Sequence, residues 1–249
     1  MTRCSNNHEV WKGFLLAHPY RLWGWNLASW LTLLIWILLD ASAGASWNQL
    51  AAAVDLQLGE LSRLPFPFFL MAALLGLSLL GMVVAWVSIV AGPRNYRSLL
   101  AWMATIGLTS LWLGLIVNMP DLIWSGYRFR LHAALPKYEA ATRPLCADWP
   151  NSDGEMEAWG PYSAYPIAQP KMLLMLAPPE ICSGSHVVSV ERAESGGVRL
   201  ELTGKEQGVW LEWHPPGSEP SSFVGGLADP HRLIRTSRLR DNWFVVRYK

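Results

Sequence analysis

The hydrophobic positions of this chain are concentrated in three uninterrupted blocks. Residues 22–39 (LWGWNLASWLTLLIWILL), 68–91 and 99–117 hold 18, 24 and 19 residues without an ionisable side chain. A helix that crosses the hydrocarbon core of a bilayer needs roughly 20 apolar residues, and a soluble core rarely supplies three such runs. The pattern therefore predicts three transmembrane helices within residues 22–118, in preference to buried helices of a soluble protein.

A further helical pattern lies between the first two blocks. In residues 47–62 the apolar side chains recur at helical spacing on one face, whereas Asp55 and Glu60 fall elsewhere. Pro65 and Pro67 follow this segment and would end a helix. The segment is predicted to be an amphipathic helix that lies at the outer membrane interface or packs on the other helices as a lid.

The C-terminal half has a different pattern, that of short strands. Residues 119–145 predict a connector, helical around 132–141, and six prolines in 146–182 predict mostly extended loop with one strand at 172–176. Alternation with a period of two then predicts antiparallel strands at residues 186–193, 198–203, 209–214, 233–239 and 243–248. The predicted fold class is an α+β membrane protein with three transmembrane helices followed, at 146–249, by a small antiparallel β-sheet domain, either a sandwich or an open barrel.

Composition agrees with a membrane protein. Hydrophobic residues make up 51% of the chain and charged residues 16%, whereas about a quarter of the residues of a soluble domain are charged. The length of 249 residues predicts one or two domains.

The stretch ILLDASAGASW, residues 37–47, resembles a signal-peptide cleavage site because Ala-Ser-Ala and Ala-Gly-Ala triplets follow the first apolar block. A signal peptide has an apolar region of about 7–15 residues, so the 18-residue block favours a retained anchor over a cleaved segment. With either outcome the C-terminal domain lies on the same side of the membrane.

Basic residues near the helix ends predict the orientation, because Lys and Arg favour cytoplasmic loops. The N-terminal segment 1–21 and the short turn GPRNYRS carry five of them: Arg3, Lys12, Arg21, Arg94 and Arg97. The opposite side carries four: Arg63, Arg128, Arg130 and Lys137. The prediction is a multi-pass protein of an inner or plasma membrane, with a cytoplasmic N-terminus and an extracytoplasmic β domain.

The cysteines are consistent with export of this domain. Cys4 falls in the N-terminal segment, whereas Cys146 and Cys182 both fall in the C-terminal part. Two cysteines on the exported side are a candidate disulfide, because an oxidising compartment permits one. The alternative is a pair of thiols.

The strongest charge feature is a cluster of arginines near the C-terminus. Residues 146–231 contain 12 acidic and 4 basic residues, whereas 232–249 contain six basic residues and one acid. The cluster comprises Arg232, Arg235, Arg238 and Arg240. It predicts a cationic surface for lipid headgroups or an anionic envelope partner, with cross-strand pairing to acidic strands as the alternative.

Sequence motifs give little indication of catalysis. The chain contains no G-x-S-x-G elbow, P-loop, dinucleotide fingerprint, H-E-x-x-H or paired C-x-x-C. Cys182 could act as a nucleophile with His186, His214 or Asp229 as its base or orienting group. His186, His214 and His231 lack the spacing of metal ligands, so no metal site and no cofactor are predicted.

These features together predict a noncatalytic, membrane-anchored recognition or assembly protein that presents a β domain on the extracytoplasmic face. The expected partners are the lipid bilayer and an envelope or membrane protein, and not a nucleic acid. Two alternatives remain open: a membrane-bound enzyme with a Cys or His site in the β domain, and a small accessory subunit of a transport complex. The oligomeric state does not follow from the sequence.

Overall fold

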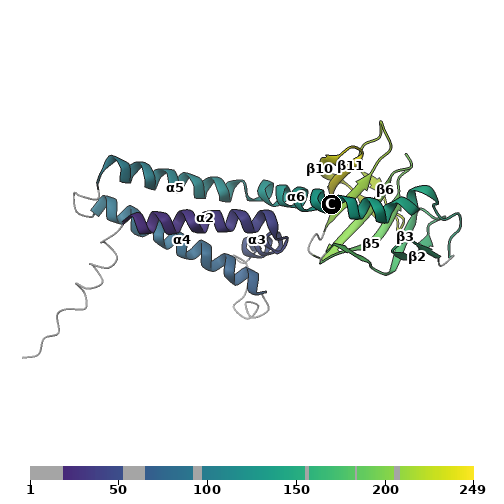
Figure 1. Cartoon of the computed structure of the whole chain (residues 1–249), viewed down its shortest axis with the longest axis horizontal. Coiled ribbons are helices and arrows are strands. Elements are labelled where there is room, and N and C mark those ends of the chain that lie inside the picture. Colours follow the sequence, from purple (N-terminus) through teal and green to yellow (C-terminus); the bar gives the residue numbers. More distant parts are fainter. Residues whose placement is uncertain (1–18, 53–64, 92–96, 155–156, 183, 205–207) are drawn as a thin grey trace, which may run out of the picture. The chain divides into compact units, whose positions relative to one another are not determined.

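The structure is a computed structural model, shown in Figure 1, and its polypeptide divides into two compact units, Met1–Trp124 and Ser125–Lys249. The residues that it describes are 19–52, 65–91, 97–154, 157–182, 184–204 and 208–249. The fold is α+β: the described residues form five helices, three of them long and apolar, and an antiparallel sheet.

The first unit contains the predicted spans, and all three are helices. They are α2 (Pro19–Leu39), α4 (Phe66–Ala91) and α5 (Leu99–Val117), and each is long and apolar enough to cross a membrane. The helix predicted at 47–62 begins earlier, because α3 spans Ser42–Ala52. The remainder of that predicted helix, 53–62, lies outside the described residues.

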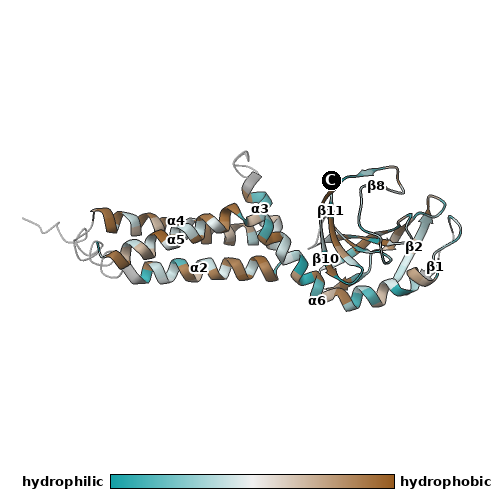
Figure 2. Cartoon of the chain, turned by 90° about the horizontal axis from the view of Figure 1, so that it is seen from above, coloured by the Kyte–Doolittle hydropathy of each residue, from teal (hydrophilic) through white to brown (hydrophobic). Residues whose placement is uncertain are grey.

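Most apolar side chains of these helices are not covered by protein. Only 28% of the most apolar window of α4 is buried, and Leu79 and Leu80 are 67% and 60% exposed. Figure 2 shows hydrophobic residues along much of the length of α2, α4 and α5. Water would make such exposure costly, whereas lipid would not, so the pattern weighs against buried helices of a soluble core.

Polar contacts and one close approach hold α2, α4 and α5 together. A Cβ atom placed on Gly81 of α4 would lie 2.9 Å from the Asn26 side-chain nitrogen of α2, so a larger residue at Gly81 would displace the Asn26 amide. The same nitrogen donates to the Leu22 carbonyl at 2.9 Å. The Trp30 indole of α2 donates to the Leu111 carbonyl of α5 at 3.1 Å.

The predicted connector is helical along its whole length. Helix α6 spans Met119–Ala147 and contains Pro136 and Pro144, whereas the sequence predicted a helix only around 132–141. A stripe of side chains explains the longer helix, because positions three or four residues apart are buried on one face. The stripe consists of Leu131, Leu135, Tyr138, Thr142 and Leu145.

The second unit contains an open antiparallel sheet. Its described strands follow the order β1-β2-β3-β5-β6-β7-β11-β10, with β4 paired to β5 and a separate β8–β9 pair. Because all described strands except the short β8–β9 pair belong to one open sheet, the domain is not a two-sheet sandwich. The strands are β1 (Glu157–Trp159), β2 (Tyr162–Ile167), β3 (Met172–Ala177), β4 (Glu180–Cys182), β5 (Ser185–Arg192), β6 (Val198–Gly204), β7 (Val209–Trp213), β8 (Phe223–Val224), β9 (Pro230–His231), β10 (Leu233–Arg240) and β11 (Trp243–Tyr248).

Six of these strands were predicted from the sequence, with bounds that differ by one residue at most: β3, β5, β6, β7, β10 and β11. The prediction of mostly loop between 146 and 182 was wrong at β1, β2 and β4. Strand β2 contains Pro166 and still pairs with β3 over residues 163–167, since the residues that flank the proline supply the ladder hydrogen bonds.

The sheet has two chemically different faces because side chains alternate along each strand. The helix face carries Leu200, Leu211 and Val245, which are paired across β6, β7 and β11 and fully buried. The loop face carries the alternate residues and is covered by the segment 215–232. Figure 2 shows α6 and β8 on opposite sides of the sheet.

Candidate functional site

The four predicted arginines lie on or next to β10, which forms one edge of the sheet. Arg235 lies opposite Arg247 of β11, and Arg238 lies opposite Phe244, so the arginines are divided between the two faces of the strand. The Arg238 guanidinium carbon is 5.7 Å from the centroid of the Phe244 ring. Arg238 and Arg240 are exposed, and Arg235 is half-buried.

Acidic residues are scarce around β10. Strand β11, which pairs with it, has the sequence WFVVRY and no acidic residue. In the following turn, the Arg240 Nε lies 3.4 Å from the Asp241 carboxylate, and Arg238 donates a hydrogen bond to the Asp241 carbonyl. The Arg240–Asp241 pair is solvent-exposed and therefore weak. Arg232 precedes the strand and exchanges main-chain hydrogen bonds with Lys249.

The predicted disulfide is absent. Cys146 and Cys182 are both thiols in the structure, which is the alternative that the sequence left open. Cys146 lies near the end of α6 beside a cavity that Trp213 and Trp243 also line, whereas Cys182 is the last residue of β4 and pairs with Ser185. The two cysteines therefore have different surroundings.

The register of the sheet separates Cys182 from one of the bases proposed for it. Cys182 is aligned with Ser185, which pairs with Gly204 at one end of β6. His214 follows Trp213, which pairs with Val198 at the other end of β6. Six residues of strand correspond to about 20 Å, so a Cys182–His214 pair is wrong. Of the three candidates, only His186 lies in the β4–β5 ladder with Cys182.

The loop face contains a buried polar cluster centred on Glu212. Glu212 is fully buried, and its carboxylate accepts a hydrogen bond from the Tyr248 hydroxyl at 2.6 Å. The other carboxylate oxygen lies 2.7 Å from Nε2 of His214 and 3.7 Å from Nε of Arg199. Burial and the neighbouring Glu212 charge raise the pKa of Tyr248, so its hydroxyl remains a donor at neutral pH.

His214 links this cluster to the covering segment. Its Nδ1 atom lies 3.2 Å from the Ser218 hydroxyl, and its side chain is 1% exposed. With Glu212 as a carboxylate acceptor, we assign the imidazole hydrogen to Nε2. Nδ1 is then a lone-pair acceptor, and Ser218 donates to it.

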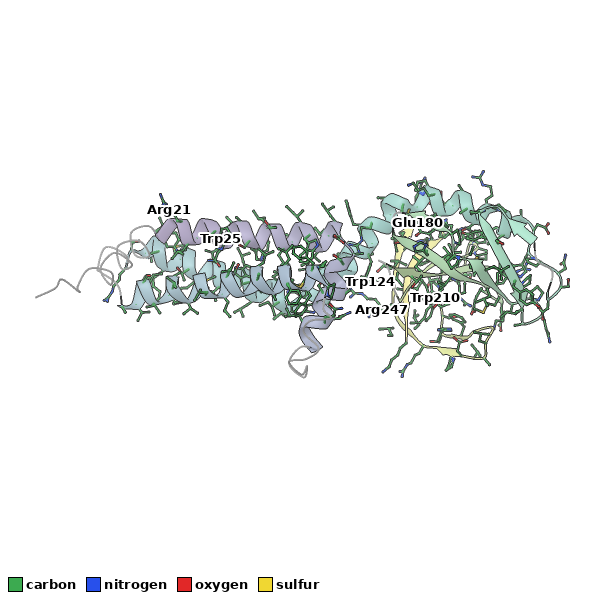
Figure 3. The ribbon with its side chains drawn as sticks, turned by 90° about the horizontal axis from the view of Figure 1, so that it is seen from below. Arg21, Trp25, Trp124, Glu180, Trp210 and Arg247 are labelled. Carbon is green, nitrogen blue, oxygen red and sulfur yellow. The ribbon has the colours of Figure 1, made fainter. Side chains whose placement is uncertain are left out.

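Arg199 has unused hydrogen-bonding capacity. The residue is 5% exposed, and its Nε atom has no hydrogen-bond partner. Its guanidinium carbon lies 3.8 Å from the centroid of the Phe223 ring, a cation–π contact. Phe223 also packs against Trp210 and Tyr248, at centroid distances of 5.8 and 5.1 Å; Trp210 is labelled in Figure 3.

A second acidic group lies near Gly225. Glu191 is 1% exposed and accepts a hydrogen bond from the Gly226 amide at 3.3 Å, and burial raises its pKa. Asp229 forms an ion pair with His231 at 2.7 Å. A Cβ atom on Gly225 would lie within 3.1 Å of all three side chains, so this position requires glycine. Among the described residues, no group of His, Cys, Asp or Glu is arranged to hold a metal ion.

A polar cavity of about 380 Å³ adjoins the Glu212 cluster. Both members of the Ser218–His214 pair line it, together with Arg199 and Lys171. The Lys171 ammonium donates to the Val224 carbonyl at 2.6 Å. The cavity therefore brings a hydroxyl, an imidazole and two cationic groups to one wall.

Another cavity, of about 400 Å³, lies in the first unit. Residues of α3, α4 and α5 line it, and Ser78 and Thr109 supply hydroxyl groups to an otherwise largely apolar surface. No ionisable residue is among those that line it. Such a surface suits an apolar chain better than an ion.

The sequence analysis missed the Glu212 cluster. His214 was considered only as a lone histidine or as a partner of Cys182. The available signal was the alternation of WLEWH, which places Trp210, Glu212 and His214 on the same face. Comparisons with protein-family models, curated proteins and solved structures found no match to this chain.

Proposed function

We propose that the protein is a membrane-anchored recognition or assembly protein that presents its β domain on the extracytoplasmic face of an inner or plasma membrane. Helices α2, α4 and α5 anchor the chain. The edge strand β10 binds an extended acidic segment of a partner protein in the envelope or membrane. Binding at this edge involves no chemical step.

The distribution of basic residues supports the proposed orientation. Arg94 and Arg97 lie between α4 and α5, and Arg3, Lys12 and Arg21 precede or begin the first span. Short loops rich in arginine and lysine stay in the cytoplasm. Three crossings then place the β domain on the opposite side of the membrane.

The observation that carries the proposed binding is the concentration of arginine on an edge strand whose neighbour β11 has no acid. Arg235 lies opposite Arg247, and like charges directly opposite each other in a sheet repel. An anionic group placed beside them would be attracted by both guanidinium groups. The same concentration of charge would also attract an acidic partner from a distance.

The main chain of β10 favours a protein partner over a lipid headgroup. An edge strand presents unpaired N–H and C=O groups along one side, and another extended chain can pair with them. A lipid headgroup would use the positive charge alone. Charged edge strands can also serve to prevent unwanted pairing, and a binding measurement separates that role from recognition.

The test uses the full chain in detergent micelles and two immobilised octapeptides, one of eight Glu residues and the other of eight Lys residues, because the arginines of β10 lie on both faces of the strand. The Glu peptide should bind, and binding should weaken as salt is added. Replacing Arg235, Arg238 and Arg240 by Gln should lower the affinity about tenfold or more, since each exposed charge pair contributes up to about 1 kcal/mol.

A charge-matched control separates a local effect from a general effect of net charge. The control variant carries the same change at three exposed basic residues of α6: Arg128, Lys137 and Arg143. It should bind the Glu peptide as the wild type does. Equal loss in both variants, or no binding of the Glu peptide at all, refutes the proposal. Binding to vesicles of anionic lipid in place of the peptide would identify the surface as a lipid site.

A further inference from the structure

Ser218, His214 and Glu212 form a chain of hydrogen bonds at the wall of the polar cavity, away from β10. The Ser218 hydroxyl lies 3.2 Å from Nδ1 of His214, and Nε2 of His214 lies 2.7 Å from Glu212. A hydroxyl, an imidazole and a carboxylate in this order can activate a serine nucleophile, whatever the order of the residues in the sequence. Here Nδ1 faces the serine and Nε2 the carboxylate, the reverse of the Ser-His-Asp triad, and either ring nitrogen is basic when the other carries the hydrogen. We propose that this site hydrolyses small carboxylic esters.

The local structure fixes the roles of the three side chains. Glu212 is fully buried in β7, and Tyr248 holds its second oxygen at 2.6 Å, so the carboxylate is fixed relative to the sheet. It orients His214 and keeps the hydrogen on Nε2, which makes it a positioning residue. His214 is 1% exposed, so its free Nδ1 is shielded from bulk water and faces the Ser218 hydroxyl.

The hydrolysis proceeds in two balanced steps. Ser218 Oγ forms a bond to the acyl carbon as its proton moves to Nδ1 of His214, and the ester C–O bond breaks while His214 returns that proton to the departing alcohol oxygen. Water then attacks the acyl-serine and gives a proton to His214. The acyl–Oγ bond breaks, Ser218 regains its proton from His214, and a carboxylic acid is released.

Two cationic side chains lie at the cavity that Ser218 lines. Arg199 and Lys171 line the same cavity as Ser218. The Arg199 Nε has no hydrogen-bond partner and lies 3.7 Å from the Glu212 carboxylate. A buried donor without a partner can donate a hydrogen bond to a developing oxyanion. Donors of this kind contribute to catalysis by stabilising the charge that develops in the transition state. The volume of about 380 Å³ limits the substrate to a small ester.

The same contacts also fit a purely structural role. Ser218 lies four residues after His214, and its amide donates to the Pro215 carbonyl at 3.0 Å, so the hydroxyl–imidazole bond could simply close a turn. A structural hydroxyl is no more reactive than its neighbours, whereas an activated one is. Covalent labelling therefore distinguishes the two roles.

The experiment treats the full chain in detergent micelles with a fluorophosphonate probe and locates the adduct by peptide mass spectrometry. The phosphorus should attach to Ser218 Oγ with loss of fluoride, at a rate at least 100-fold above that of Ser195 or Ser221, which line the same cavity. Ser218→Ala should abolish labelling. The matched variants Ser195→Ala and Ser221→Ala should leave it unchanged.

Glu212→Gln tests the positioning role. The Gln amide would donate to Nε2, which moves the imidazole hydrogen to Nδ1 and removes the base, so labelling should fall at least 100-fold with the fold retained in the circular dichroism spectrum. If that variant unfolds, the labelling rate of wild-type Ser218 still decides the question. No preference for Ser218 over the other two serines, or unchanged labelling in Glu212→Gln, refutes the proposal. Neither result bears on peptide binding at β10.

Discussion

Replacing Tyr248 by Phe tests whether the sheet holds the Glu212 carboxylate through hydrogen bonds. The change removes the hydroxyl that donates to Glu212 at 2.6 Å and keeps the ring, which packs edge-to-face on Trp210 with centroids 5.7 Å apart. A hydrogen bond to a charged group contributes about 1.5–3 kcal/mol. Glu212 is fully buried, so water cannot replace the lost donor. We expect a loss of about 2 kcal/mol.

Hydrogen exchange of the full chain in micelles measures this loss where it occurs. Amides of β7 and β11 should exchange about 30-fold faster in Tyr248→Phe, because 1.4 kcal/mol corresponds to a factor of ten. The helical unit should be unaffected, since its contacts do not change. Peptides from α4 therefore provide an internal reference in the same sample.

A second tyrosine supplies the control. Tyr165 of β2 is 39% exposed, and Tyr165→Phe removes a hydroxyl from a position that water can reach. Exchange in β7 and β11 should then remain within about twofold of the wild type, as is usual for surface changes. If Tyr248→Phe also stays within twofold, the Tyr248–Glu212 hydrogen bond does not stabilise the sheet, and the rigid cluster inferred here is wrong.

Three further predictions concern stability, sidedness and insertion. Burial raises the pKa of Glu191, so wild-type stability should fall as the pH rises from the ordinary carboxyl range through the raised pKa; Glu191→Gln should flatten this fall in thermal unfolding between about pH 4 and pH 7. A membrane-impermeant maleimide applied to intact cells, without prior reduction, should label Cys146 and Cys182 and spare Cys4; the reverse pattern would invert the orientation. Leu80→Lys, on an exposed part of α4, should cost about 3 kcal/mol on insertion and increase the alkali-extractable fraction, whereas an unchanged fraction would argue against a transmembrane α4.

The elements that the sequence predicted correctly are those set by a single strong requirement. A helix long and apolar enough to cross a membrane needs a long run without charge, and the three blocks match α2, α4 and α5 within about three residues at each end. A half-buried strand needs alternation, and β6 shows it in VRLELTG. Each requirement acts locally, so it can be detected without knowledge of the rest of the fold.

The errors fall where tertiary packing overrides a local signal. A helix was predicted only around 132–141, yet α6 extends well beyond it on both sides and contains Pro136 and Pro144, because Leu131, Leu135 and Leu145 lie in one buried stripe. A proline removes one helical hydrogen bond, and burial of large apolar side chains can offset that cost. The strands β1 and β2 were missed for a related reason, since a proline-rich composition does not reveal pairing partners.

The Tyr248–Glu212 contact was beyond the reach of sequence motifs because its two residues come together only in the folded sheet. Tyr248 is 36 positions from Glu212, and only the pairing of β7 with β11 brings these strands together. Motif searches also look for nucleophiles on sharp strand-to-helix turns, whereas Ser218 lies in a proline-rich loop. The arginines of β10 could be found from the sequence, since charge density requires no knowledge of contacts.

The two faces of the sheet bury different kinds of side chain. The helix face buries Leu200, Leu211 and Val245 and supplies apolar stabilisation. The loop face of strands β6 and β7 buries Arg199 and Glu212. The Nε atom of Arg199 has no hydrogen-bond partner. Buried ion pairs generally stabilise a fold no better than apolar side chains of the same volume, and an unused buried donor is a net cost. The loop face also buries the apolar cluster of Trp210, Phe244 and Val246, so the polar groups are an addition to its apolar packing, and the serine-labelling experiment decides whether they also act on a ligand.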